Sequence, residues 1–196
     1  LDLIRVYTIS RLGWIRKQRA KLQAQERETP RDYVDRESHF VWGKRYLMAV
    51  TEANGPPAVR LSHNRMHLSV RPDTPTDRRQ AIVEEWYRKQ VRDEAMPVVA
   101  EWQPRLAVSV EHIFVQKMRT RWGSCNPGTR SIRLNTDLAK KPRQCLEYIV
   151  VHEMLHTLEP THNAHFQALM DQFMPQWRLR RAQLNDLPVR HEEWTY

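Results

Sequence analysis

The sequence is poor in the residues that define secreted or membrane-embedded proteins. Two cysteines in 196 residues, Cys125 and Cys145, cannot build a disulfide framework, so we expect reduced thiols in a cytoplasmic protein. The apolar runs span only a few residues, far below the roughly 20 that a membrane-spanning helix needs, so we expect no membrane partner. Glycine is also scarce, with five residues, which excludes a collagen-like repeat.

What is present argues for an ordinary folded chain with a basic surface. Hydrophobic residues make up 40% and charged residues 28% of the sequence, which is typical of a packed core with a solvated exterior. The net charge of +9 favours an anionic partner. The first residue is Leu1 rather than Met, and basic residues interrupt the apolar positions of residues 1–24, so we expect that a preceding piece is absent rather than that a targeting peptide begins here.

Apolar periodicity predicts an α+β fold in three consecutive segments that can form one integrated domain. Residues 1–35 predict an amphipathic helix to about residue 25 and a charged linker. Residues 36–72 alternate with a period of two between turn residues, which predicts a four-stranded antiparallel meander. Residues 73–196 predict a helical core with short strands.

The core segment contains several predicted elements. A long amphipathic helix is expected to end at Pro104, because proline interrupts helical hydrogen bonding. The remaining expected elements are strands at 108–110, 112–118 and 131–134, a polar loop at 119–130, and helices at 142–158, 163–173 and 175–184.

The predicted helix at 142–158 contains the chemical motif of the chain, His152-Glu153-Met154-Leu155-His156. Residues four apart lie on one face of a helix, so two imidazoles at this spacing can share a metal ion while Glu153 reaches its open coordination position. Zinc suits two neutral imidazoles, a third protein ligand and a water. His162, His165 and Asp171 are the candidates for the third ligand, with His162 favoured by its spacing. That spacing equals the metzincin spacing, but Glu159 stands where the metzincin signature has glycine, so the turn must be built differently.

Positive charge is concentrated just before this motif. From Lys117 to Arg143 there are eight basic residues and a single acidic residue, Asp137. Such a field would attract acidic peptides, nucleotides, or proteins held on nucleic acid. Within it, Arg119, Arg121 and Trp122 are candidate substrate-binding residues.

Two further residues of this stretch have competing interpretations. Cys125 is either a buried thiol or a metal contact, and the thiol is favoured. Asn135 either binds substrate backbone or caps a turn, and the cap is favoured. For Arg121 and Trp122 the structural alternative is a loop in which the tryptophan fills the core and the arginine pairs with a carboxylate.

Several stretches together resemble the YgjP-like metallopeptidase domain family, relatives of the SprT-like and WLM metalloproteases in the zincin group. The matching stretches are Gln116–Cys125 with its RWGSC loop, Ser131–Leu138, Pro142–Leu158, Glu159–Phe166 and Met174–Trp177, with weaker likeness at Glu85–Arg88 and Ser38–Tyr46. The resemblance implies an HExxH helix in a zincin-like core with a strand-rich N-terminal part packed on it. It also implies Zn²⁺ on His152, His156 and His162, with Glu153 as general base.

The leading functional prediction is therefore a zinc-dependent metallopeptidase acting on a peptide or protein substrate, anionic or nucleic-acid-associated. Zinc would activate a water and polarise the scissile carbonyl, while Glu153 would move the proton. A metal-dependent nucleotide pyrophosphatase or other phosphohydrolase is the first alternative, because the basic stretch suits a nucleotide. A zinc-stabilised nucleic-acid-binding module is the second, disfavoured because a closed structural site needs four protein ligands and no base.

Overall fold

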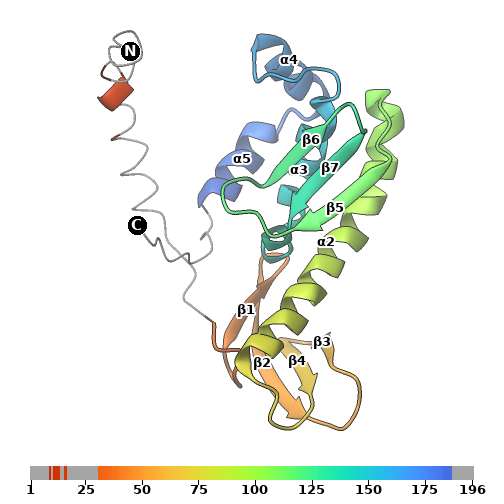
Figure 1. Cartoon of the computed structure of the whole chain (residues 1–196). Coiled ribbons are helices and arrows are strands. Elements are labelled where there is room, and N and C mark those ends of the chain that lie inside the picture. Colours follow the sequence, from red (N-terminus) through yellow and green to blue (C-terminus); the bar gives the residue numbers. More distant parts are fainter. Residues whose placement is uncertain (1–8, 10, 14–15, 17–30, 187–196) are drawn as a thin grey trace. The chain divides into compact units, whose positions relative to one another are not determined.

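The computed structural model describes residues 9, 11–13, 16 and 31–186 (Figure 1). The chain divides into two compact units, Arg31–Leu184 and Leu1–Pro30 with Asn185–Tyr196. The described residues 9, 11–13 and 16 are helical; the rest of the helix predicted for residues 1–25, and the linker as far as residue 30, lie outside the described residues. The unit Arg31–Leu184 contains both β-sheets.

A four-stranded sheet begins this unit. Its strands are β1 (Ser38–Val41), β2 (Lys44–Glu52), β3 (Ala58–Ser62) and β4 (Arg65–Val70), in the order β1-β2-β4-β3. The β1–β2 and β3–β4 pairs are antiparallel, but β2 pairs with β4 in parallel, so the predicted antiparallel meander is wrong. The reason lies in burial, because Met66, Leu68 and Val70 of β4 are at most 1% exposed and occupy the centre, whereas the mostly exposed β3 takes the edge.

Helix α2 (Thr76–Leu106) contacts both sheets, on β3 and on β5 (Figure 1). Its buried residues recur every three to four positions, which explains the amphipathic pattern of the sequence: Val83, Tyr87, Val91, Ala95, Val99, Trp102 and Leu106. The prediction that Pro104 ends this helix is wrong, because the helix continues to Leu106 and stops at Ala107 in a left-handed conformation. Residues 108–110 are not a strand as predicted, since the Val110 N–H donates to the Gln103 side chain instead of a neighbouring strand.

A second, three-stranded sheet follows, with β7 in its centre. Its strands are β5 (His112–Gln116), β6 (Gly123–Asn126) and β7 (Ser131–Asn135), in the order β5-β7-β6, with β5 parallel and β6 antiparallel to β7. Strand β6 lies inside the segment predicted as a polar loop, which corrects that prediction. At the end of β7, Asn135 caps a short 3-10 helix, η1 (Thr136–Lys140), by accepting from the Asp137 N–H, as the capping interpretation expects.

Three helices complete the described part: α3 (Arg143–Leu155), α4 (Ala164–Phe173) and α5 (Trp177–Asp186). Helix α3 starts directly after Pro142 as predicted and ends at Leu155, three residues earlier than expected. Nine of its 13 residues are buried, and it packs against α2, β6 and β7. Buried residues of both sheets and of α2, α3, α4 and α5 belong to one hydrophobic core. No described helix combines the length and apolar character required to cross a membrane.

Candidate metal centre

Three imidazoles converge at the end of α3. One nitrogen of each of His152, His156 and His162 can be chosen so that all lie within 4.8 Å of one another. The Nε2 atoms of His152 and His162 are 2.9 Å apart, close to the separation of about 3.3 Å expected between two nitrogens of a tetrahedral zinc site. Among the described residues this is the one group of three or more histidine, cysteine or acidic side chains with metal-binding spacing. The donor set therefore fits zinc.

The ring of His156 is oriented by a backbone carbonyl. Its Nδ1 lies 3.0 Å from the carbonyl oxygen of Glu159 and donates to it when protonated. That hydrogen bond leaves Nε2 to face the other two imidazoles, which is the usual arrangement of a metal-binding histidine. The third imidazole comes from the turn after α3, and His162 is exposed, so the site opens to solvent on this side.

A buried phenylalanine lies beneath the three rings. Phe166 of α4 is 2% exposed, and its ring centroid lies 4.7 to 4.9 Å from those of His152, His156 and His162. It stacks on His156, with an interplanar angle of 22°. The apolar ring limits the rotamers of all three imidazoles and excludes water from one side of the cluster.

The same surroundings favour the neutral form of His152 and His162. Burial, followed by the nearby His156, His162 and Arg181, lowers the pKa of His152 to about 3. Burial, then His156 and Arg181, also lowers the pKa of His162. The Nδ1 atom of His152 is buried without a hydrogen-bond partner in the described part of the chain, which is a further cost of charging this ring. Neutral imidazole is the form that binds a metal ion.

Glu153 lies beside the cluster and is 5% exposed. Burial raises its pKa to about 8, and the positive charge of Arg121 acts in the opposite direction. Gly123 of β6 faces it directly, because a Cβ on this glycine would come within 2.7 Å of Glu153 Oε1. The sheet and the helix thus meet at a glycine and a carboxylate, next to the candidate ligands.

The rival third ligands are engaged elsewhere. Asp171 accepts from Trp177 Nε1 at 2.7 Å and pairs with Arg178, so its carboxylate is used in joining α4 to α5. His165 Nδ1 lies 3.3 Å from a Glu159 oxygen. Cys125 is a free, partly buried thiol outside the histidine cluster, and burial together with Glu153 raises its pKa to about 11. These contacts leave His162 as the third histidine of the cluster.

The family relationship agrees with this geometry. The model of the family described as YgjP-like, metallopeptidase domain, matches residues 2–187. The chain belongs to the YgjP-like metallopeptidase domain family. A search of curated proteins gives no match to it.

Two solved structures of archaeal metallopeptidase zymogens are similar to parts of this YgjP-like chain. Abylysin of Pyrococcus abyssi shares 14% identity at a TM-score of 0.41, covering 48% of this chain and 90% of its own. Jannalysin of Methanocaldococcus jannaschii shares 18% identity at a TM-score of 0.37, covering 48% of this chain and 88% of its own.

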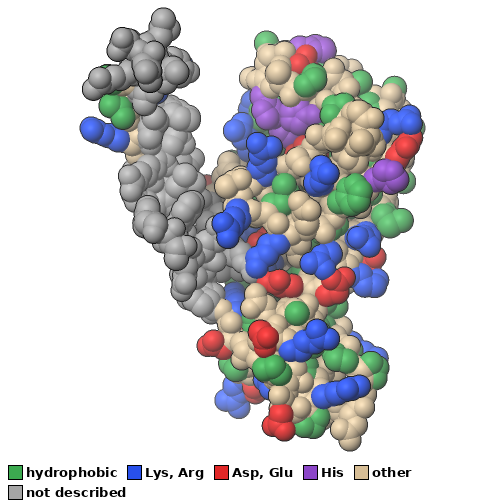
Figure 2. Space-filling view, viewed as in Figure 1, with side chains coloured by type: hydrophobic (Ala, Val, Ile, Leu, Met, Phe, Trp, Pro, Cys, Tyr) green, Lys and Arg blue, Asp and Glu red, His purple; other side chains and the backbone are tan. Residues whose placement is uncertain are grey.

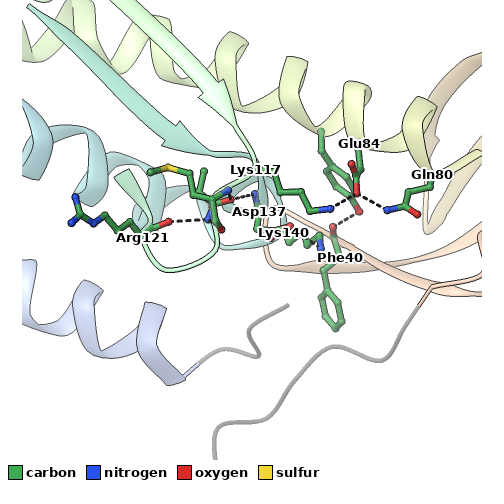
Figure 3. A network of polar contacts seen from close by, with 10 residues as sticks. Phe40, Gln80, Glu84, Lys117, Arg121, Asp137 and Lys140 are labelled. Carbon is green, nitrogen blue, oxygen red and sulfur yellow. Dashed lines mark hydrogen bonds and ion pairs between the residues drawn. The ribbon is translucent and has the colours of Figure 1, made fainter. Parts of the chain in front are cut away.

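At least half of the positive charges in residues 117–143 of the YgjP-like chain are paired with carboxylates. Four of the eight cations in this stretch form ion pairs: Lys117 with Glu84, Arg130 with Glu111, Lys140 with Asp137 and Arg143 with Glu94. Figure 3 shows Lys117 and Gln80 both directed at Glu84, while the side chain of Arg121 extends away from this network. Three of the four carboxylates come from outside residues 117–143. The charge balance of this stretch alone therefore overstates the unpaired positive charge near the motif.

The predicted substrate-binding residues lie in the segment just before β6. Arg119 and Arg121 are exposed, and Arg121 is near enough to Glu153 to influence its pKa. Trp122 is half-buried against the hydrophobic core, with Lys141 Nζ 5.8 Å from its ring centroid. The packing of Trp122 agrees with the structural alternative, and Arg121 lies near the Glu153 carboxylate, which both interpretations allow.

Three residues of the centre were not identified as functional from the sequence. Phe166 lies in the first turn of α4, and its apolar spacing with Leu169 and Phe173 indicates a buried face, but nothing in the sequence places that face against the histidines. Arg181 of α5, whose charge reaches His152, His162 and Tyr148, carries no local signal because α5 is remote in sequence. Figure 2 shows Lys and Arg side chains beside the histidine cluster on the surface. Glu159 was noted in the sequence only as the residue in the place of the metzincin glycine.

Proposed function

We propose that this YgjP-like metallopeptidase is zinc-dependent, with His152, His156 and His162 as metal ligands and Glu153 as general base. The observation that carries the proposal is the approach of three imidazole nitrogens to within 4.8 Å of one another, next to the buried carboxylate of Glu153. Three histidines leave a coordination position open, as catalytic zinc sites do.

Zinc bound there would supply a Lewis acid for the scissile carbonyl and lower the pKa of a water molecule to about 7. Glu153 takes a proton from the attacking water and delivers it to the leaving amine. Its ionised form is favoured by Arg121, and its position is held by the contact with Gly123. Arg121 also remains a candidate for stabilising negative charge that develops on the substrate.

A free sheet edge beside Glu153 supports a peptide substrate. No described strand pairs with β6 on the side opposite β7. The Trp122 carbonyl accepts from Asn135 of β7 at 2.9 Å, so strand alternation directs the backbone groups of Gly123 and Cys125 toward the other edge. An extended peptide can add there as a further strand, with main-chain hydrogen bonds providing affinity.

The experiment compares wild type with Glu153→Gln against a peptide library and a panel of nucleoside triphosphates, with bound metal measured in both proteins. We expect the wild type to cleave peptides, and the Gln variant to bind as much zinc while losing activity by at least about 100-fold. Equal activity of the two proteins contradicts the role of Glu153. Cleavage of triphosphates alone would replace the peptidase by a nucleotide hydrolase.

A further inference from the structure

Glu159 connects the last turn after α3 with the segment that carries His162. One carboxylate oxygen accepts from the Thr161 N–H at 3.1 Å and from the Thr161 hydroxyl at 2.8 Å. The other lies 3.3 Å from His165 Nδ1. These hydrogen bonds, those of Thr161 first, lower the pKa of Glu159 to about 2, so its carboxylate is ionised at neutral pH.

The backbone of the same residue contacts the metal centre from the other side. The Glu159 carbonyl oxygen is the hydrogen-bond partner of His156 Nδ1, at 3.0 Å. The Glu159 N–H donates to the Leu155 carbonyl at 3.0 Å, which ties this carbonyl to the end of α3. Glu159 therefore contacts one candidate ligand through its backbone and the segment of another through its side chain.

The hydrogen-bonded turn continues into α4. Asn163 donates to the Thr161 hydroxyl at 3.1 Å, and its side-chain oxygen caps α4 by accepting from the Phe166 N–H at 2.9 Å. Phe166 in turn packs on all three imidazoles. Thr161 is thus held between Glu159 and Asn163, directly before His162.

We propose that Glu159 is a positioning residue of the metal centre, whose carboxylate closes the turn that brings His162 to His152 and His156. It does the work that a glycine-based turn does at this position in the metzincin signature. The inference rests on the proposed function, because it takes the three histidines as metal ligands. A carboxylate suits the position because Thr161 offers two donors, its N–H and its hydroxyl, and His165 Nδ1 can offer a third.

The size of the effect can be ranked by side chain. Glu159→Gln keeps one acceptor oxygen for Thr161 but presents an amide N–H₂ to the remaining donor. Glu159→Ala removes both acceptors and leaves the backbone carbonyl in place. Substitution of a residue that hydrogen-bonds to metal ligands typically lowers metal affinity by about 10- to 100-fold. We expect a loss in this range for Ala and a smaller loss for Gln.

The test measures Zn²⁺ and Co²⁺ dissociation constants by competition with a chromophoric chelator, for wild type, both variants and Asp171→Asn. Asp171 is a matched control, because it is also a hydrogen-bonded carboxylate in this part of the chain but pairs with Trp177 and Arg178. The unfolding temperature of each metal-free protein and the visible spectrum of each cobalt complex are recorded alongside. We expect weaker metal binding and an altered cobalt spectrum for the Glu159 variants alone.

The results distinguish a failure of the three-histidine site from a failure of the positioning role of Glu159. A wild type that binds neither ion contradicts the three-histidine centre itself. A wild type that binds zinc while both Glu159 variants bind it equally well overturns the positioning role and leaves the centre intact. Should Glu159→Ala not fold, the isosteric Gln variant decides, and an unchanged affinity for it overturns the role.

Discussion

Gly123 lies so close to Glu153 that a Cβ at this glycine would come within 2.7 Å of both Cγ and Oε1 of the glutamate. The space for the Glu153 carboxylate is thus created by the absence of a side chain on the neighbouring strand. The backbone of β6 and the carboxylate of α3 are held together at the point where a substrate strand would pass.

Gly123→Ala is therefore predicted to displace Glu153. We expect kcat/KM for peptide cleavage to fall by about 100-fold, because a catalytic group moved by about 1 Å loses this much. Zinc affinity should stay within about threefold of wild type, since none of the three histidines is touched. Gly55→Ala is the control, because nothing lies within 4 Å of a Cβ there. Equal activity of the two alanine variants would contradict the tight contact.

Arg121→Ala is predicted to reduce kcat/KM by about 10- to 100-fold without loss of zinc, because it removes the positive charge that favours ionised Glu153. Arg133→Ala removes the same charge from β7, where the guanidinium lies over the Phe114 ring, 5.7 Å from the centroid. Steady-state kinetics of both variants give the comparison. A comparable loss in Arg133→Ala would indicate a general field effect rather than a local one.

Phe166→Ala is predicted to destabilise the protein by about 3–5 kcal/mol, because it empties a buried site beneath three imidazoles. Zinc affinity should fall with it, and Phe166→Leu should recover part of both. Phe114, which is 45% exposed, provides the same substitution at the surface, where we expect a change below about 1 kcal/mol. Chemical denaturation with and without zinc measures these changes, and equal effects at the two positions would contradict the packing role.

His39 is predicted to make the stability depend on pH far from the metal centre. It is 3% exposed and bonded to Glu37 at 2.7 Å; burial lowers its pKa, with Glu37 opposing and Arg31 and Lys140 adding to the lowering. Below pH 6.5 the unfolded chain therefore binds more protons at this residue than the folded protein, and stability falls as the pH decreases through this window.

The measurement compares the free energy of unfolding of metal-free wild type and His39→Gln at pH 7.5 and 5.5. Because the other titrating groups are common to both proteins, the wild type should lose more stability than the variant between these two pH values. A larger loss in the variant would mean that burial does not dominate at His39.

The cluster of His152, His156 and His162 was largely predictable because its main signal is local. His152, Glu153 and His156 are neighbours at the end of one helix, and because α3 ends at Leu155, the chain can turn so that His162 returns to them. Pairing between strands has no such local signal. The alternation of Met66, Leu68 and Val70 predicts a strand, but only their complete burial places it between β2 and β3.

Strand β6 illustrates the same limit at the site itself. Its sequence, Gly123-Ser124-Cys125-Asn126, has no apolar alternation and resembles a loop. It is extended because β7 offers hydrogen-bonding partners, which the local sequence cannot reveal. The ion pairs of Lys117, Arg130 and Arg143 were missed for a similar reason, since their carboxylates lie 33, 19 and 49 residues away in the chain, respectively.

The central claim, a metal ion held by His152, His156 and His162, is tested most directly by zinc stoichiometry. Each histidine is replaced by alanine in turn, with His165→Ala as the control, and bound zinc is measured after dialysis against a weak chelator. We predict one zinc per chain in the wild type and in His165→Ala, and loss of zinc in the other three variants. Retention of zinc by His162→Ala together with its loss from His165→Ala would contradict the assignment.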